Sequence, residues 1–163
     1  RSAPGFNRSF ACESWEMADK ELVERIRAEA DEKADYDVEL DITGYDIDGK
    51  MVEIANKNAE EAGLAGIINF KQQAVKDFKT EQKNGVMIGN PPYGQRLSDQ
   101  KAAREIYRQL GTVTRPLVTW SKYFITSDLD FEKYYGQSAT KKRKLYNGAL
   151  RTDYFQFWGK RER

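Results

Sequence analysis

Apolar and polar positions recur along the first half of this chain with two different periods. Apolar residues return at helical spacing within 17–30 and again within 49–62. Short apolar runs at 40–45 and 67–70 have the length of buried strands. Because these helix-like and strand-like segments alternate, the pattern predicts βαβ units and a parallel sheet.

The ends of the two helical segments carry residues that are typical of caps. Ser14 precedes the first segment, and Asp48 directly precedes the second. Side chains of this kind accept hydrogen bonds from the first backbone N–H groups of a helix. Gly63 follows the second segment and is the residue type most often found where a helix ends. We therefore expect Ser14 and Asp48 as N-caps and Gly63 at a C-terminus.

The second half of the chain continues the alternation and then changes it. The run 85–89 is apolar and bounded by glycine, which predicts a third buried strand at 86–88. The rest of the pattern predicts a helix that includes 102–110, a strand at 120–126, a short helix at 131–135 and a hairpin turning at Asn147-Gly148. The predicted fold class is α/β, a doubly wound sheet closed by an antiparallel hairpin.

Composition adds an uneven distribution of charge. The 163 residues are enough for one domain, and 27 Lys+Arg nearly balance 26 Asp+Glu. Residues 16–60 carry 15 acidic and 6 basic side chains, whereas 141–163 carry 8 basic and 2 acidic. The basic segment includes Lys142, Arg143 and Lys144 and is interleaved with aromatic residues. It is either a solvated face or a surface for RNA or single-stranded DNA.

Two scarce residue types narrow the possible chemistry. The chain has no histidine, which excludes a histidine triad, a histidine general base and histidine metal ligands. Its one cysteine, Cys12, excludes an intrachain disulfide and a cysteine-rich metal site, and is expected to be a small buried hydrophobe. We expect no metal. Without a signal peptide or a long apolar segment, we also expect a soluble, cytoplasmic protein with no membrane partner.

Asn90-Pro91-Pro92-Tyr93 directly follows the predicted strand at 86–88. Ligands of open α/β sheets bind just beyond the carboxyl ends of the strands. The two prolines stiffen this loop, so the Asn90 amide oxygen and the Pro91 carbonyl become fixed acceptors, and Tyr93 offers a face for stacking. Such a loop suits a planar –NH2 group, for example a nucleobase amine, although a rigid connecting turn would have the same sequence.

This tetrapeptide resembles the catalytic motif of S-adenosylmethionine-dependent amino-group methyltransferases. The resemblance implies a class I methyltransferase domain, Rossmann-like, whose last two strands form an antiparallel hairpin. It implies catalytic roles for Asn90, Pro91, Pro92 and Tyr93, with the acceptors holding the amine hydrogens and the nitrogen lone pair aimed at the methyl group. Catalysis of this kind depends on positioning and requires little from a strong base.

The same resemblance implies residues that hold S-adenosylmethionine. An acid at the end of the second strand of such a domain binds the ribose hydroxyls, and here Asp46 and Asp48 are candidates, each of which could instead be a cap or turn residue. The position next to the adenine amine matches Ala74, with Asp77 three residues later as its candidate substitute. Asn90 would also border the cofactor.

The glycine-rich loop that relatives carry after their first strand is not found, since no Gly-x-Gly occurs in the sequence. We therefore expect residues 1–163 to be the C-terminal portion of a catalytic domain, truncated before or within its first strand–loop–helix unit. In this fold the first strand lies between the second and the fourth. Its absence would leave two apolar strand edges unpaired.

Three stretches resemble bacterial large-subunit ribosomal RNA guanine-N2 methyltransferases of the type that also carries an RNA-binding THUMP domain. They are 3–10, 90–97 and 144–148. The expected activity is methyl transfer to guanine N2 of ribosomal RNA, with Arg96, Lys142, Arg143 and Lys144 as candidate phosphate contacts. A DNA adenine-N6 methyltransferase is the alternative, and a non-catalytic RNA-binding module is a further one.

Overall fold

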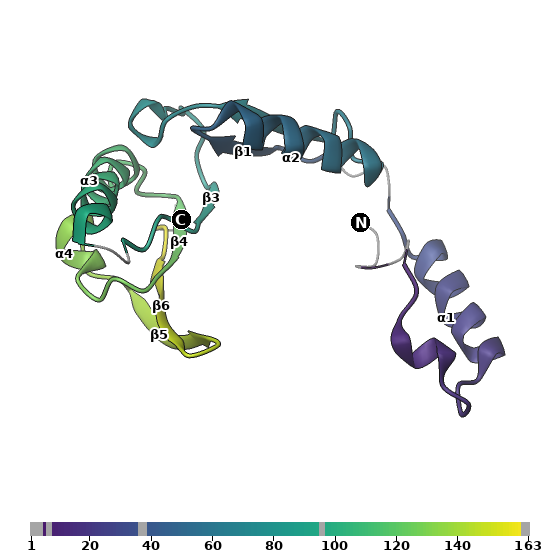
Figure 1. Cartoon of the computed structure of the whole chain (residues 1–163). Coiled ribbons are helices and arrows are strands. Elements are labelled where there is room, and N and C mark those ends of the chain that lie inside the picture. Colours follow the sequence, from purple (N-terminus) through teal and green to yellow (C-terminus); the bar gives the residue numbers. More distant parts are fainter. Residues whose placement is uncertain (1–4, 6–7, 36–38, 95–96, 161–163) are drawn as a thin grey trace.

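The structure, a computed structural model, describes residue 5 and residues 8–35, 39–94 and 97–160 (Figure 1). Helices and strands alternate through most of it. In chain order they are η1 Ala11–Ser14, α1 Lys20–Glu32, β1 Ile42–Asp46, α2 Gly49–Glu61, β2 Ile68–Gln72, η2 Val75–Asp77, β3 Val86–Gly89, α3 Leu97–Thr114, β4 Ser121–Thr126, α4 Phe131–Tyr135, β5 Lys141–Asn147 and β6 Leu150–Phe157. Among these helices none is long and apolar enough to cross a membrane.

The strands form two sheets with the predicted mixture of directions. β1 and β2 pair in parallel, joined by α2. The second sheet has the order β3-β4-β6-β5, in which β3 and β4 are parallel and the other pairs are antiparallel. β5 and β6 form the hairpin that Asn147-Gly148 predicted, and Gly148 takes the positive φ of 60° that favours glycine in such turns.

β1 and β3 each keep one unpaired edge within the described part of the chain. β1 bonds to β2 alone, and β3 bonds to β4 alone. On β3 the apolar side chains of Val86 and Ile88 are 61% and 79% exposed, although their strand reads as a buried one. The two free edges that the sequence predicted are therefore present, on the strands that correspond to the second and fourth of the complete fold.

The hydrophobic core lies in the C-terminal half, where α3 and α4 cover one face of the four-stranded sheet. Alternate positions on β4 and β6 point into it, so that Phe124, Phe155 and Phe157 are buried together with Phe131 and Tyr135 of α4. The two helices approach closely at Gly111, where a Cβ atom would lie 2.0 Å from the Tyr135 carbonyl oxygen. A larger residue there would push the helices apart.

The N-terminal helix α1 buries none of its residues, and Figure 1 shows it apart from the other helices. Its N-cap is Asp19, which accepts a hydrogen bond from Leu22 N–H at 3.0 Å, so the prediction of Ser14 was wrong. Ser14 instead belongs to η1 and donates to the Ala11 carbonyl. Cys12, expected to be buried, is exposed because η1 packs against no core.

The helix α2 has both predicted caps. The Asp48 carboxylate accepts a hydrogen bond from Lys50 N–H at 2.9 Å, and Gly63 follows the helix with a φ of 70°. The other elements match their predicted positions within three residues, except that α3 extends beyond the predicted 102–110 at both ends. The helix α4 has the predicted bounds at both of its ends.

Candidate active site

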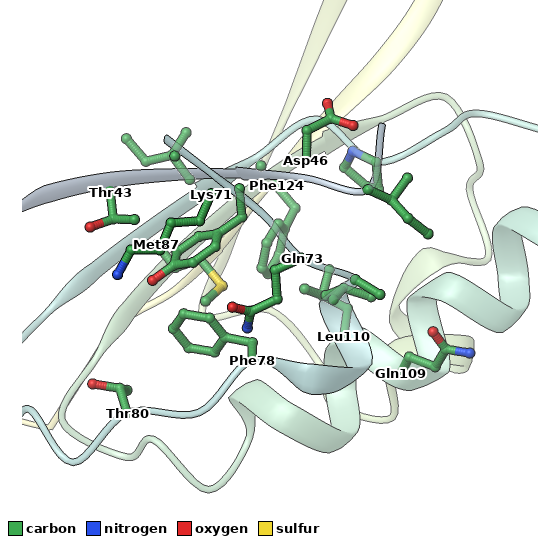
Figure 2. Close-up of a pocket in the computed structure, with 18 of the residues that line it drawn as sticks. Thr43, Asp46, Lys71, Gln73, Phe78, Thr80, Met87, Gln109, Leu110 and Phe124 are labelled. Atoms are coloured by element: carbon green, nitrogen blue, oxygen red, sulfur yellow. The ribbon is translucent and has the colours of Figure 1, made fainter. Parts of the chain in front are cut away.

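A cavity of about 830 Å³ lies between the two sheets (Figure 2). β1 and β3 contribute to its lining, together with the loop after β2, the inner face of α3 and Trp120 at the start of β4. Figure 2 shows apolar side chains of Phe78, Met87, Leu110 and Phe124 in its middle and polar groups around them. Its size lies within the range of small-molecule and cofactor sites.

Aromatic side chains connect the two sheets beside this cavity. Tyr45 of β1 meets Phe78 edge to face, with ring centroids 5.6 Å apart. Phe78 in turn meets Trp120 at 6.2 Å, and Trp120 Nε1 donates to the Gln82 carbonyl at 2.7 Å. Because Trp120 adjoins β4, these contacts link the two-stranded sheet to the four-stranded one across the residues that line the cavity.

The loop Asn90–Tyr93 begins where β3 ends, and Asn90, Pro91 and Pro92 line the cavity. The Asn90 side chain is exposed and forms no hydrogen bond with any residue that the structure describes. Gly94 ends the loop with a φ of 62°, and a Cβ atom there would lie 2.6 Å from Gln100 Cα in α3. Glycine therefore lets the chain turn from the loop into the helix.

Tyr107 of α3 supports the loop from inside the protein. Its hydroxyl donates to the Pro92 carbonyl at 2.6 Å and also contacts Thr126 Oγ1 at 3.1 Å. Burial raises the pKa of Tyr107, while the hydrogen bond to Thr126 acts in the opposite direction. The hydroxyl consequently keeps its proton at neutral pH and remains a donor.

Asp46 lies at the carboxyl end of β1, Asn90 directly follows the carboxyl end of β3, and both residues line the cavity. One carboxylate oxygen of Asp46 accepts a hydrogen bond from Asp48 N–H at 2.8 Å, which fixes the orientation of the group. A carboxylate has about four acceptor positions, so capacity for a ligand remains. The Asp46 carbonyl also accepts from Gln73 N–H at 2.8 Å.

The other two predicted acidic residues do not line this cavity. Asp48 caps α2, and Asp77 ends the short helix η2. Gln73, which the sequence analysis did not select, does line it, and Figure 2 shows its amide near the Phe78 ring. Its position could have marked it as a candidate binding residue, because Gln73 is polar and directly follows the carboxyl end of β2.

The basic residues of the hairpin differ in their contacts. Lys142 forms an ion pair with Glu132 at 2.9 Å and lies over the Phe155 ring. Burial acts to raise the pKa of Glu132, but hydrogen bonds from Ala139 N–H and Lys142 outweigh it and hold that pKa below its usual value. Lys144 lies over the Tyr146 ring, and Arg143 is exposed.

Two further predictions concern ligands, namely a phosphate contact by Arg96 and the expectation of no metal. Arg96 lies outside them, so its predicted phosphate contact has no structural counterpart. In the part of the chain that the structure describes, no group of three His, Cys, Asp or Glu residues could hold a metal ion.

Parallel strands followed by an antiparallel hairpin, with Asp46 and an Asn-Pro-Pro-Tyr loop on one cavity, define a class I methyltransferase fold. The family described as RMKL-like, methyltransferase domain, matches residues 1–156, and the chain belongs to it. The predicted resemblance and fold class are confirmed.

Curated relatives carry RNA methyltransferase names. YpsC of Bacillus subtilis (strain 168), whose name places it among RNA methyltransferases, is 54% identical over 158 residues, which are 97% of this chain and 41% of YpsC. The ribosomal RNA large subunit methyltransferase K/L of Methylococcus capsulatus is 33% identical over 159 residues, 95% of this chain and 22% of that protein. The chain thus spans about two fifths of one relative and about a fifth of the other.

Solved structures share the fold over nearly the whole chain. SMU.472, crystallised in complex with SAH, has a TM-score of 0.92 and 55% identity, over 99% of this chain and 43% of SMU.472. A protein of Listeria monocytogenes described as a predicted N6-adenine-specific DNA methylase has a TM-score of 0.89 and 49% identity, over 98% of this chain and 41% of that one.

Proposed function

We propose that the complete gene product transfers a methyl group from S-adenosylmethionine to an exocyclic amine of RNA, most specifically guanine N2 of large-subunit ribosomal RNA. The observation that carries this proposal is the shared cavity, which both Asp46 and the Asn90–Pro92 part of the loop line. Membership of a methyltransferase-domain family supports the reaction type. The name of the Methylococcus capsulatus relative supports the ribosomal substrate.

The residues of the cavity fit S-adenosylmethionine by their chemistry. Asp46 offers carboxylate acceptors for two ribose hydroxyls, and its orientation is already fixed by Asp48 N–H. Gln73, whose backbone N–H bonds to the Asp46 carbonyl, also lines the cavity, and its amide carries both donors and an acceptor, which suits the edge of an adenine ring. Apolar side chains between these groups suit the flat faces of the base. When bound, the cofactor supplies the electrophilic methyl group.

The loop would position the amine that accepts the methyl group. Asn90 Oδ1 and the Pro91 carbonyl would each accept one hydrogen of the –NH2 group and so orient its nitrogen for transfer, in which an N–CH3 bond would form as the S–CH3 bond breaks and one amine proton would pass to water. Tyr93 stacks on the base and excludes water from one of its faces. A paired guanine would have to be flipped out of its helix to reach this loop. No imidazole is required, in agreement with a sequence that has none.

Phosphate contacts are proposed on the hairpin. Arg143 and Lys144 extend from β5 without an ion pair among the described residues, and the exposed ring of Tyr146 lies next to them. Lys142 is held by Glu132 and contributes less free charge. RNA backbone binding through two or three such cations would weaken steeply as salt is added.

The chain is proposed to be one portion of a single catalytic domain. The free edges of β1 and β3, together with the exposed Val86 and Ile88, leave space and bonding groups for one further strand and its covering helix. A structure of the complete gene product would test this. A strand from outside 1–163 bonded to both edges is the expected result, and direct pairing of β1 with β3 would contradict it.

DNA adenine N6 is the second candidate acceptor, because the Listeria monocytogenes relative is described as acting on it. The two bases share an exocyclic amine, and the loop would present the same acceptors to either. The discriminating experiment offers unmodified bacterial ribosomal RNA and duplex DNA side by side with methyl-labelled S-adenosylmethionine. Label in an RNA guanine is expected, and label in DNA adenine would replace the first candidate by the second.

The role of Asn90 is tested in the same assay. Asn90→Ala removes one of the two acceptors, and the expected loss in transfer rate is about 100-fold or more, comparable to removal of one group that stabilises a transition state. Asn56→Ala, on the exposed face of α2, is the matched control and should retain the wild-type rate. A near-normal rate in Asn90→Ala would refute the catalytic assignment.

A further inference from the structure

The two prolines make the Asn90–Tyr93 loop stiff but leave some of its backbone torsion angles unconstrained. Proline fixes φ but leaves ψ free, and neither Pro91 nor Pro92 has an N–H group with which to attach itself. The orientation of the Pro92 carbonyl, which ψ of Pro92 sets, decides in which direction the chain continues into Tyr93. One contact must therefore hold that carbonyl if the tyrosine is to keep a fixed place.

Tyr107 supplies this contact from the helix behind the loop. It is fully buried, and its hydroxyl lies 2.6 Å from the Pro92 carbonyl oxygen. Of the side chains that the structure describes, Tyr107 alone forms a hydrogen bond with residues 90–94. The Tyr107 ring packs edge to face against Phe131 of α4, with centroids 4.9 Å apart, so the hydroxyl has little freedom to move.

Donor and acceptor can be assigned for every hydrogen bond in the series behind Tyr107, because one terminal group can only donate and the other can only accept. Asp128 N–H can only donate, and it donates to Thr126 Oγ1 at 3.2 Å. The Pro92 carbonyl can only accept, so the single hydrogen of the Tyr107 hydroxyl is used there. The Thr126 hydroxyl must then donate to the Tyr107 oxygen across their 3.1 Å contact. Each hydroxyl donates once and accepts once.

The far end of this chain of bonds is anchored by an ion pair. Arg104 Nε donates to Asp128 at 2.9 Å, and the Arg104 guanidinium also reaches Asp130 and lies over the Tyr134 ring. The turn after β4 is consequently tied to α3 on one side and to the loop on the other. A continuous series of bonds thus joins Asp128, Thr126, Tyr107 and Pro92.

We propose that Tyr107 is a positioning residue, whose hydroxyl holds the Pro92 carbonyl and thereby places Tyr93 and the two acceptors for methyl transfer. This inference rests on the proposed function of the loop. Tyr107 is not itself among the residues that line the cavity with Asp46, so we expect its main effect on the amine side of the reaction and a small one on cofactor binding. Loss of its hydroxyl should lower kcat with little change in KM for S-adenosylmethionine.

The fold provides a closely matched control. Tyr135 is also fully buried, and its hydroxyl also bonds to a threonine hydroxyl, that of Thr114 at 2.7 Å, but it forms no contact with the loop. In the complete gene product, Tyr107→Phe and Tyr135→Phe should shift the melting temperature by similar amounts. Only Tyr107→Phe should lower kcat, by roughly 10- to 100-fold, because small displacements of reacting groups are costly.

Thr126 gives a second test that does not alter the tyrosine. Thr126→Val removes the donor to Tyr107 and should lower kcat less than Tyr107→Phe does, whereas Thr126→Ser keeps the hydroxyl and should retain the wild-type kcat. If Tyr107→Phe does not fold, the comparison of these two threonine variants decides the proposal.

The possible outcomes of these kinetic measurements are distinguishable. A kcat of Tyr107→Phe equal to that of Tyr135→Phe would overturn the positioning role, as would equal values for Thr126→Val and Thr126→Ser. A raised KM for S-adenosylmethionine in Tyr107→Phe would also overturn it, since the effect would then lie on the cofactor side. Normal transfer by Asn90→Ala would instead refute the catalytic role of the loop, and absence of transfer by the wild-type protein would refute the proposed function itself.

Discussion

At the scale of single residues, Asp46 and Asp48 differ in role although they are two positions apart. Asp46 is one of the residues that line the cavity, and the Asp48 carboxylate accepts a hydrogen bond from Lys50 N–H at the start of α2. Asp48 also contributes its backbone N–H, which binds and orients the Asp46 carboxylate. The first is thus a candidate ligand of the cofactor, and the second supports it.

Neutral substitutions separate these two roles. Asp46→Asn replaces one charged acceptor by a donor, and we expect the Kd for S-adenosylmethionine to rise about tenfold, equivalent to about 1.4 kcal/mol. Asp48→Asn should leave that Kd nearly unchanged, because asparagine caps helices as well as aspartate does. Isothermal titration of the complete gene product would measure both. An equal rise in the Kd of the two variants would mean that Asp48 also contributes to cofactor binding.

The sequence favoured Asp46, which ends its strand, over Asp48, which stands where a helix cap is expected, and the structure places Asp46 on the cavity and Asp48 at the start of α2. Asn90–Tyr93 was predictable because its sequence and its place after a strand are both specific. Asp77 was selected for its charge, whereas Gln73, one of the residues that line the cavity, is uncharged and drew no attention. The direction of a side chain at the end of a strand depends on the turn that follows, and only the structure gives it.

At the scale of elements, the hairpin is fixed to α4 by a carboxylate. Glu132 accepts hydrogen bonds from Ala139 N–H at 2.7 Å and from Lys142 at 2.9 Å, which join α4 to the start of β5. Since these bonds hold the pKa of Glu132 below its ordinary value, the charged form is favoured more in the folded protein than in the unfolded one. The free energy of unfolding should therefore depend on pH through this residue.

The sign follows from the lowered pKa. The contribution of Glu132 is present above the ordinary glutamate pKa of about 4.3 and is lost as the pH falls through its lower folded value. Because the ion pair is partly exposed, we expect Glu132→Gln to cost about 0.5–1 kcal/mol at pH 7 and less at a pH of about 3.5, below the ordinary glutamate pKa. Urea unfolding at both pH values measures this. Glu105→Gln, which removes a more exposed ion pair with Arg108, is the control and should show a smaller difference between the two pH values.

The order and type of elements were predictable from apolar spacing, but one helix start was not. Ser14 and Asp19 both precede the apolar face of α1, and both are good capping residues. Asp19 lies directly before the helix, and Ser14 is used within η1. Which of two nearby capping residues is used depends on where the preceding turn ends. The spacing of apolar residues does not predict where that turn ends.

At the scale of the whole molecule, the two halves of the chain differ in how much they bury. The buried cluster belongs to α3, α4, β4 and β6, whereas α1 buries nothing and α2 buries Ala59 alone. Apolar residues of the N-terminal elements, such as Ile26, Ile47 and Ile54, remain more than half exposed. The apolar spacing of the sequence predicted that Ile26 lies on one face of a helix, and no element among the described residues buries that side chain.

This asymmetry predicts how the chain behaves when it is produced alone. Amides of α3, β4 and β6 should exchange with solvent slowest, since they belong to the packed half, and amides of α1 and β1 should exchange much faster.

In the complete gene product, a strand between β1 and β3 would protect amides on both edges and cover the apolar face of β3. Hydrogen exchange followed by mass spectrometry would compare the two proteins segment by segment. Equal protection of β1 and β3 in both would mean that no further strand enters the sheet. Added protection limited to these edges and to α1 would show that the two halves require a segment outside 1–163 to form one domain.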